Sequence, residues 1–118
     1  MANGNDTIPG NRSVAVGIND SLTVAGDLTV QVGRNAARTV QSNETVAVGQ
    51  ELKLLVGKHV VVQAGDSLTF KVGSASLTMK KDGSIVIKGK DITLDGSGKV
   101  TAKASGDVVL KGSKIQQN

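Results

Sequence analysis

An aliphatic residue recurs every eight positions between residues 16 and 72, and this repeat constrains the fold more than any other feature. Valine occupies seven of the eight positions and alanine the other: Val16, Val24, Val32, Val40, Val48, Val56, Ala64 and Val72. Glycine follows directly in six of the eight units. A short fixed period of this kind is typical of repeat architectures, in which each unit packs on its neighbours instead of on a globular core.

Each eight-residue unit has the pattern of a short strand followed by a corner. In one unit Leu28, Val30 and Val32 share a face, while the intervening Thr29 and Gln31 share the opposite face. The rest of each unit is rich in Gly, Asn, Asp and Ser, which are the residues that favour turns. We therefore expect an all-β chain.

The apolar face of these strands needs a partner, because a lone strand with two or three aliphatic side chains is marginal in water. A single-chain solenoid usually needs about twenty residues per turn, whereas eight residues suit one wall and a corner. The chain has a single aromatic residue, so its core must be narrow. We favour an intertwined triple-stranded β-helix, a homotrimeric β-prism of octapeptide repeats, over residues 13–118, after an irregular leader at 1–12.

The repeat changes phase after Ser74. Apolar residues then fall at odd positions, and Asp82-Gly83 separates two alternating segments, 76–81 and 84–89. Asp-Gly between alternating segments predicts a hairpin, or a corner of altered length. The eight-residue spacing resumes afterwards, with apolar pairs at 92/94, 100/102 and 108/110.

The composition argues against several classes of function. The net charge is +4, no five basic residues run together, and aromatic residues for stacking on bases are missing, so we expect no nucleic-acid binding. Without cysteine the chain forms neither disulfides nor a thiolate metal site. No apolar run approaches eighteen residues, and residues 1–11 are too polar for a signal peptide.

Motifs for catalysis or cofactor binding are also missing. His59 is the single histidine and has no Ser/Asp arrangement nearby, so we expect it to face solvent. Neither a glycine-rich phosphate loop nor a calcium-binding nonapeptide occurs. We therefore expect no enzyme, no cofactor and no metal.

Arg38 occupies a position at which every neighbouring unit carries an aliphatic residue. One interpretation is a local distortion at residues 35–37 that turns the side chain to the surface. The other places three copies of Arg38 near the axis of the trimer, neutralised by Glu44 or by a trapped anion, because buried charges need partners.

Two segments carry a family resemblance. The first is Val14-Ala15-Val16-Gly17-Ile18-Asn19, and the second is the run from Ala104 to Ile115, ASGDVVLKGSKI. Both resemble the C-terminal needle of VgrG proteins, the spikes of bacterial type VI secretion systems, and the first also resembles phage tail spikes. The resemblance covers residues 13–118 and implies a trimeric β-helical needle that punctures a target membrane and is injected from the bacterial cytoplasm into a target cell.

The resemblance also implies partners. A cone-shaped PAAR-repeat protein caps the C-terminal end of such needles, and Ile115, Gln116, Gln117 and Asn118 are the residues that we expect to bind it. The family attaches to its tube protein through hub and OB-fold domains that these 118 residues lack. Some phage spikes hold iron through a His-x-His motif, but His59 lies between Lys58 and Val60, so no iron site is expected.

Two alternative functions stay open at this point. A phage tail spike would have nearly the same repeat. A β-helix that binds or cleaves polysaccharide would need paired carboxylates and aromatic sugar platforms, and the absence of Trp and Tyr disfavours it.

Overall fold

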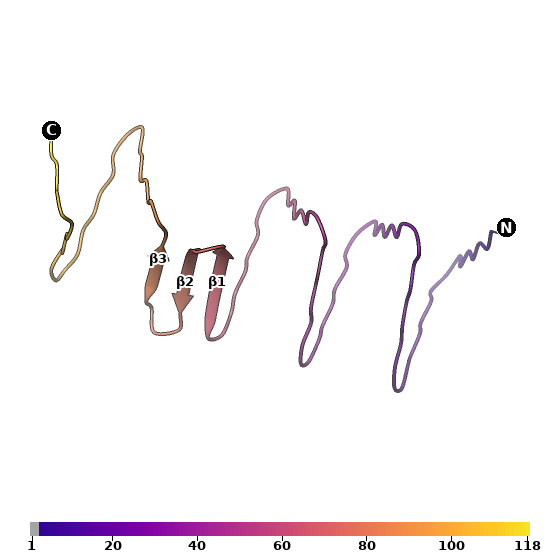
Figure 1. Cartoon of the computed structure of the whole chain (residues 1–118). Coiled ribbons are helices and arrows are strands. Elements are labelled where there is room, and N and C mark those ends of the chain that lie inside the picture. The colour runs from indigo at the N-terminus through magenta and orange to yellow at the C-terminus, as the bar shows by residue number, and fades with distance from the viewer. Residues whose placement is uncertain (1–2) are drawn as a thin grey trace. The chain divides into compact units, whose positions relative to one another are not determined.

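The computed structural model describes residues 3–118 of one chain, divided into two units between Glu51 and Leu52 (Figure 1). Its regular elements are three strands, β1 (Ser67–Val72), β2 (Ala75–Lys80) and β3 (Ile85–Lys88), all in the second unit. Across the described residues there is no helix long and apolar enough to cross a bilayer. The prediction of an all-β chain is confirmed.

The backbone outside the sheet is extended and bends at regular intervals. Bends lie at residues 9–10, 17–18, 25–26, 33–34, 41–42 and 49–50 in the first unit, and continue at 57–58 and 65–66 in the second. The spacing of the bends equals the eight-residue spacing of the valines, and most bends begin at the residue directly after one. Within residues 3–118, the extended segments between these bends lie outside the one sheet, so they belong to no β-ladder within the chain.

The three strands form one antiparallel sheet in the order β1-β2-β3. Leu68 lies opposite Met79 and Phe70 opposite Leu77 in the first pair, and Leu77 lies opposite Ile87 in the second. The backbone N–H of Lys81 donates to the carbonyl of Asp66 at 2.9 Å, which extends the first ladder by one bond.

A two-residue turn, Gly73-Ser74, joins β1 to β2. Gly73 has a φ of 54°, whereas no described residue other than glycine has a positive φ. A positive φ at the first central position alone is the type II′ pattern, whose twist suits antiparallel strands. Val72 and Gly73 continue the octad pattern of the sequence, so this hairpin was not predicted.

The turn between β2 and β3 is the hairpin that Asp82-Gly83 predicts, and it is confirmed. The N–H of Gly83 donates to the carbonyl of Lys80, and the N–H of Lys80 donates to the carbonyl of Ser84, both at 3.0 Å. Gly83 has a φ of 92°. These features fit a three-residue loop in which glycine takes the left-handed position after a β-turn.

Alternation along the strands gives the sheet two different faces. One face is apolar and carries Leu68, Phe70, Val72, Ala75, Leu77, Met79, Ile85 and Ile87. The other face carries Ser67, Thr69, Lys71, Ser76, Thr78, Lys80, Val86 and Lys88. We call the first set the apolar face and the second set the polar face.

The described chain has no buried residue, polar or apolar. Its accessible surface is 13,268 Å² for a mass of 12.0 kDa. A folded monomer of that mass exposes about 6,000 Å² and a fully unfolded chain about 17,000 Å². The single chain therefore exposes about twice the surface of a stable globule.

Gly83→Ala is expected to destabilise the folded protein by about 1–2 kcal/mol per chain, because a Cβ is disfavoured at positive φ. Gly83→Asn should lose less, since Asn tolerates the left-handed region better. Denaturant melts followed by circular dichroism measure the difference. Gly4→Ala is the control, because Gly4 has no neighbour within 4 Å of a built Cβ and no positive φ; equal losses from Gly4→Ala and Gly83→Ala would contradict the prediction.

Candidate interchain surface

The repeated valines form a stripe with a uniform environment. From Val16 to Val56 the valines of the repeat are 42–54% exposed, whereas Val72 is 82% exposed. Because exposure depends on local backbone geometry here, the narrow range indicates that successive units have the same conformation. Val72 leaves the series since it ends β1, next to the Gly73-Ser74 turn.

The residues two positions before these valines are more exposed. Leu22, Val30 and Leu54 expose 72–75% of their surface, although they lie on the same side of the extended chain as the valines that follow. So many uncovered aliphatic side chains at regular spacing exceed what soluble monomers usually present to water. The stripe therefore has the character of an interface.

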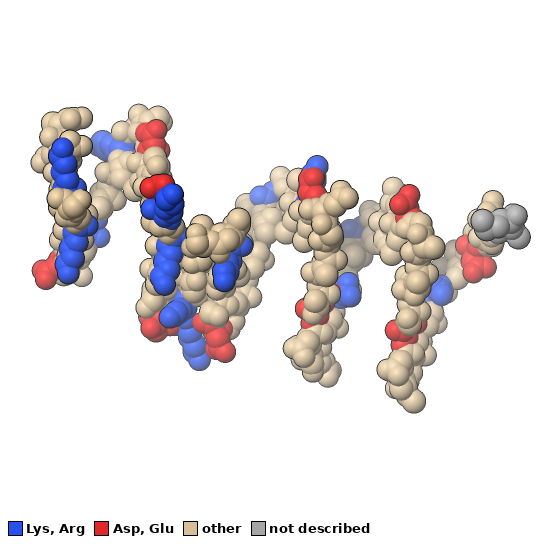
Figure 2. All heavy atoms as spheres, viewed as in Figure 1, with Lys and Arg blue, Asp and Glu red and all other residues tan. Residues whose placement is uncertain are grey.

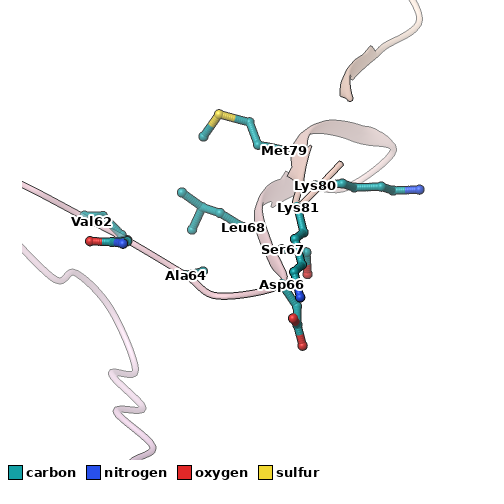
Figure 3. A pocket seen from close by; sticks show the side chains of 9 residues that line it. Val62, Ala64, Asp66, Ser67, Leu68, Met79, Lys80 and Lys81 are labelled. Atoms are coloured by element: carbon teal, nitrogen blue, oxygen red, sulfur yellow. The ribbon is translucent and has the colours of Figure 1, made fainter. Parts of the chain in front are cut away.

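A shallow hollow of about 210 Å³ lies beside β1 and β2 (Figure 3). Leu68 and Met79, which are cross-strand partners, project from the sheet to the same side, and Val62 and Ala64 line the hollow from the preceding segment. Lys80 and Lys81 lie at its edge. Its volume is below the roughly 300–1,000 Å³ that is usual for small-molecule pockets.

Further hollows adjoin the sheet, including one of about 330 Å³ on the polar face. One of about 260 Å³ lies on the apolar face between Phe70, Leu77 and Ile87. Another, about 510 Å³ and wide open, is lined by Ser74, Ile87, Lys88, Gly89, Lys90 and Ile92, which include no carboxylate and no imidazole. The linings of these hollows are mainly apolar side chains and lysine amines, with Asp66 as a carboxylate in the first hollow and no imidazole in any of these four.

Charge is divided unevenly along the chain. Residues 1–51 contain three basic and five acidic side chains, whereas residues 52–118 contain eleven basic and five acidic side chains. Figure 2 shows basic side chains concentrated on the sheet and on the segments that follow it. The net charge of the first unit is therefore −2 and that of the second is +6.

Arg38 and Glu44 form an ion pair. The Nε of Arg38 lies 2.9 Å from Oε1 of Glu44, and the side chains are 77% and 38% exposed in the single chain. The six-residue separation spans the bend at 41–42, so the pair connects the extended segments on either side of one corner. Whether the pair lies on an axis shared by several chains stays a prediction.

Asp82 stabilises the turn between β2 and β3. The backbone N–H of Ser84 donates to Oδ1 of Asp82 at 2.9 Å, and this bond, with a second contribution from the Ser84 side chain, lowers the pKa of Asp82 below its ordinary value. A lowered pKa in the folded state stabilises the fold at neutral pH, and the contribution is lost as the pH falls below the ordinary pKa of about 3.9.

The remaining predicted residues lie apart from these features. Ile115 is 64% exposed, and Gln116, Gln117 and Asn118 follow it in extended conformation. His59 is exposed, and among residues 3–118 no three His, Cys, Asp or Glu side chains gather as metal ligands.

Residues 2–81 match the family described as the bacteriophage T4 gp5 C-terminal trimerisation domain. This match covers more than half of the chain. The chain belongs to this family. The matched residues include all eight positions of the aliphatic repeat and the strands β1 and β2.

A relative of this chain is the type VI secretion system spike protein VgrG1b of Pseudomonas aeruginosa, which is 78% identical over 46 residues. The aligned segment is 39% of this chain but 6% of the relative, so the chain corresponds to a small part of that protein. The resemblance to a C-terminal VgrG spike segment, predicted from the sequence, is confirmed by the family match together with this relative.

A double-mutant cycle on Arg38→Val and Glu44→Gln measures the coupling between the paired charges. We expect a coupling free energy of about 0.2–1 kcal/mol that decreases in high salt, as for exposed ion pairs. Denaturant melts of the wild type, both single variants and the double variant supply the four values. A coupling free energy of about 3 kcal/mol or more that does not change with salt would instead show that the Arg38–Glu44 pair is buried in the folded protein.

Proposed function

We propose that this chain is the needle segment of a type VI secretion spike, a rigid homotrimer of intertwined octapeptide repeats. The uncovered aliphatic stripe carries the proposal, since it needs a partner that repeats with the same eight-residue period. Copies of the same chain meet that requirement. The family name, a trimerisation domain, and the VgrG1b relative support the same assembly.

Three copies also account for the surface area. A compact trimer of 36 kDa would expose about 4,400 Å² per chain by the scaling of folded proteins, against 13,268 Å² for the single chain. Each wall of such a prism would use one extended segment, and each bend would form a corner. The backbone groups that lack partners in one chain would then pair between chains.

Mechanical stiffness follows from this arrangement. Interchain hydrogen bonds and aliphatic packing would run along the needle without interruption, so a load along the axis would be shared by many layers. The proposed role is to puncture a target membrane when a contractile machine drives the spike out of the bacterial cytoplasm. No enzyme activity or cofactor is part of this proposal.

The partners at the two ends come from the resemblance to VgrG proteins. A PAAR-repeat protein would cap the distal end at Ile115, Gln116, Gln117 and Asn118, where exposed Ile115 provides an apolar contact. The tube protein would attach through N-terminal domains of a longer spike. A phage tail spike is the second candidate, because the matching family is described from a bacteriophage protein.

Val30→Asp is expected to abolish trimer formation, because three carboxylates would be brought together on the shared axis. Gln31→Asp, one position away on the opposite side of the extended segment, should leave the trimer intact. Sedimentation equilibrium measures the mass, which we expect near 36 kDa for the wild type and 12.0 kDa for Val30→Asp. Trimer stability should also rise with protein concentration. A monomeric, well-ordered wild type would contradict the proposal.

Deletion of residues 115–118 is expected to remove binding of a purified PAAR-repeat protein while preserving the trimer. Calorimetry of the trimer with the cap protein measures the affinity. Deletion of residues 1–12 is the matched control, since the leader should not contribute. Unchanged affinity after removal of 115–118 would show that the cap binds elsewhere.

A further inference from the structure

The octapeptide repeat leaves the alignment of the three chains under-specified. If one copy slips by eight residues, Val24 takes the place of Val32 and most other valines still meet valines. Hydrophobic pattern is normally what fixes register, and here the pattern repeats itself at each slip. An assembly built from the repeat alone would therefore contain staggered alternatives of similar free energy.

The β1–β3 sheet breaks this degeneracy because its sequence occurs once. Its apolar positions move from even to odd numbers after Gly73, it contains the single aromatic residue, Phe70, and it holds the two glycines of positive φ. A slip of eight residues would place Phe70 of one copy level with Thr78 of another. Apolar and polar faces would then be mismatched.

The sheet is also the part of the chain that one molecule can form by itself. Of residues 3–118, the four that are the least exposed are Leu68, Ser76, Leu77 and Thr78, and all lie in β1 or β2. Its pairings join residues separated by short loops, so their entropic cost is low and they form early. The extended octads have no such pairings within the chain.

The apolar face fits other copies of this chain. It is uncovered, with Phe70 57%, Ile85 65% and Ile87 62% exposed, and the outer edges of β1 and β3 carry unpaired backbone groups. The polar face carries Lys71, Lys80 and Lys88, whose ammonium groups would repel one another near an axis. Three copies therefore pack apolar faces inward and lysines outward.

We propose that the β1–β3 sheet sets the register of the trimer: it folds within each chain, joins three copies through its apolar face, and aligns the octads before they intertwine. This inference rests on the proposed trimer. In this proposal the octapeptide repeat makes the needle stiff, whereas the β1–β3 sheet aligns the three chains.

Spin labels test the register directly. The chain has no cysteine, so Gln31→Cys provides a single labelling site on the polar side of an octad. Three aligned chains give one label–label distance, whereas chains staggered by eight residues give additional, longer distances. We expect one distance in the otherwise wild-type trimer, measured by double electron–electron resonance.

The decisive comparison adds Leu77→Ser with Ile87→Ser, which weakens the apolar face, and separately Leu22→Ser with Leu54→Ser, which removes two leucines from the octads. We expect the sheet variant to show mixed distances, or no trimer, and to refold to the trimer about tenfold more slowly. The octad variant should form a less stable trimer, because Leu22 and Leu54 belong to the stripe, but it should keep one distance and refold within about twofold of wild type.

Each other result overturns the inference. A single distance in a trimeric sheet variant, or equal loss of assembly in both variants, would show that the sheet has no special role in alignment. A monomeric wild type would remove the proposed trimer itself, so failure of the function and failure of this inference are distinguished.

Discussion

The uncovered aliphatic stripe is the constraint on which the rest of the molecule depends. A chain that repeats an apolar residue every eight positions cannot bury those residues against itself, because each segment between bends is too short to enclose a core. The described residues accordingly contain none that is buried. In the proposed trimer, order comes from partners with the same period, and the regularly spaced bends of the single chain suit such partners. Folding and assembly would then be one process, with stability tied to concentration.

The sheet is the exception to that dependence, and it explains why a repeat protein benefits from an irregular segment. Regularity gives uniform layers, but it also permits many alignments of equal quality. A stretch of 22 residues with two tight turns and a unique side-chain order removes that ambiguity. Gly73 and Gly83 matter here because a positive φ reverses the chain within two or three residues, which an octad corner does not do.

Much of the fold could be predicted from the sequence because its signals are local and repeated. The Asp82-Gly83 turn is indicated directly by its sequence. The alternation of Leu28, Val30 and Val32 with polar residues predicts a strand, but in the single chain this segment is outside the three strands, because it has no partner there with which to form a ladder. The β1–β2 hairpin was not predicted, because Val72-Gly73 continues the octad pattern. A Val-Gly pair occurs both at the corners of the octads and at this chain reversal, so the sequence does not distinguish the two. The sequence named Glu44 as the neutralising partner of an Arg38 near a trimer axis; the 2.9 Å contact across a bend pairs the two side chains within one chain, and the axial site stays a prediction. The predicted cap-binding residues rest on the family resemblance alone, since Gln and Asn side chains have no pattern of their own.

The uneven distribution of charge along the chain affects whether the apolar faces of the three sheets would point toward the trimer axis or away from it. With +6 on residues 52–118 of each chain, three copies would bring eighteen net positive charges together. Exposed charges separated by more than the Debye length of about 8 Å are screened at physiological salt, whereas charges forced to an axis would not be. Two effects therefore favour a trimer in which the apolar face of each sheet points inward. Aliphatic side chains are buried, and the lysines of the polar face are kept apart on the outside. The same charge would keep assembled needles apart from one another in solution, because like-charged surfaces resist side-by-side association even where strand edges are available.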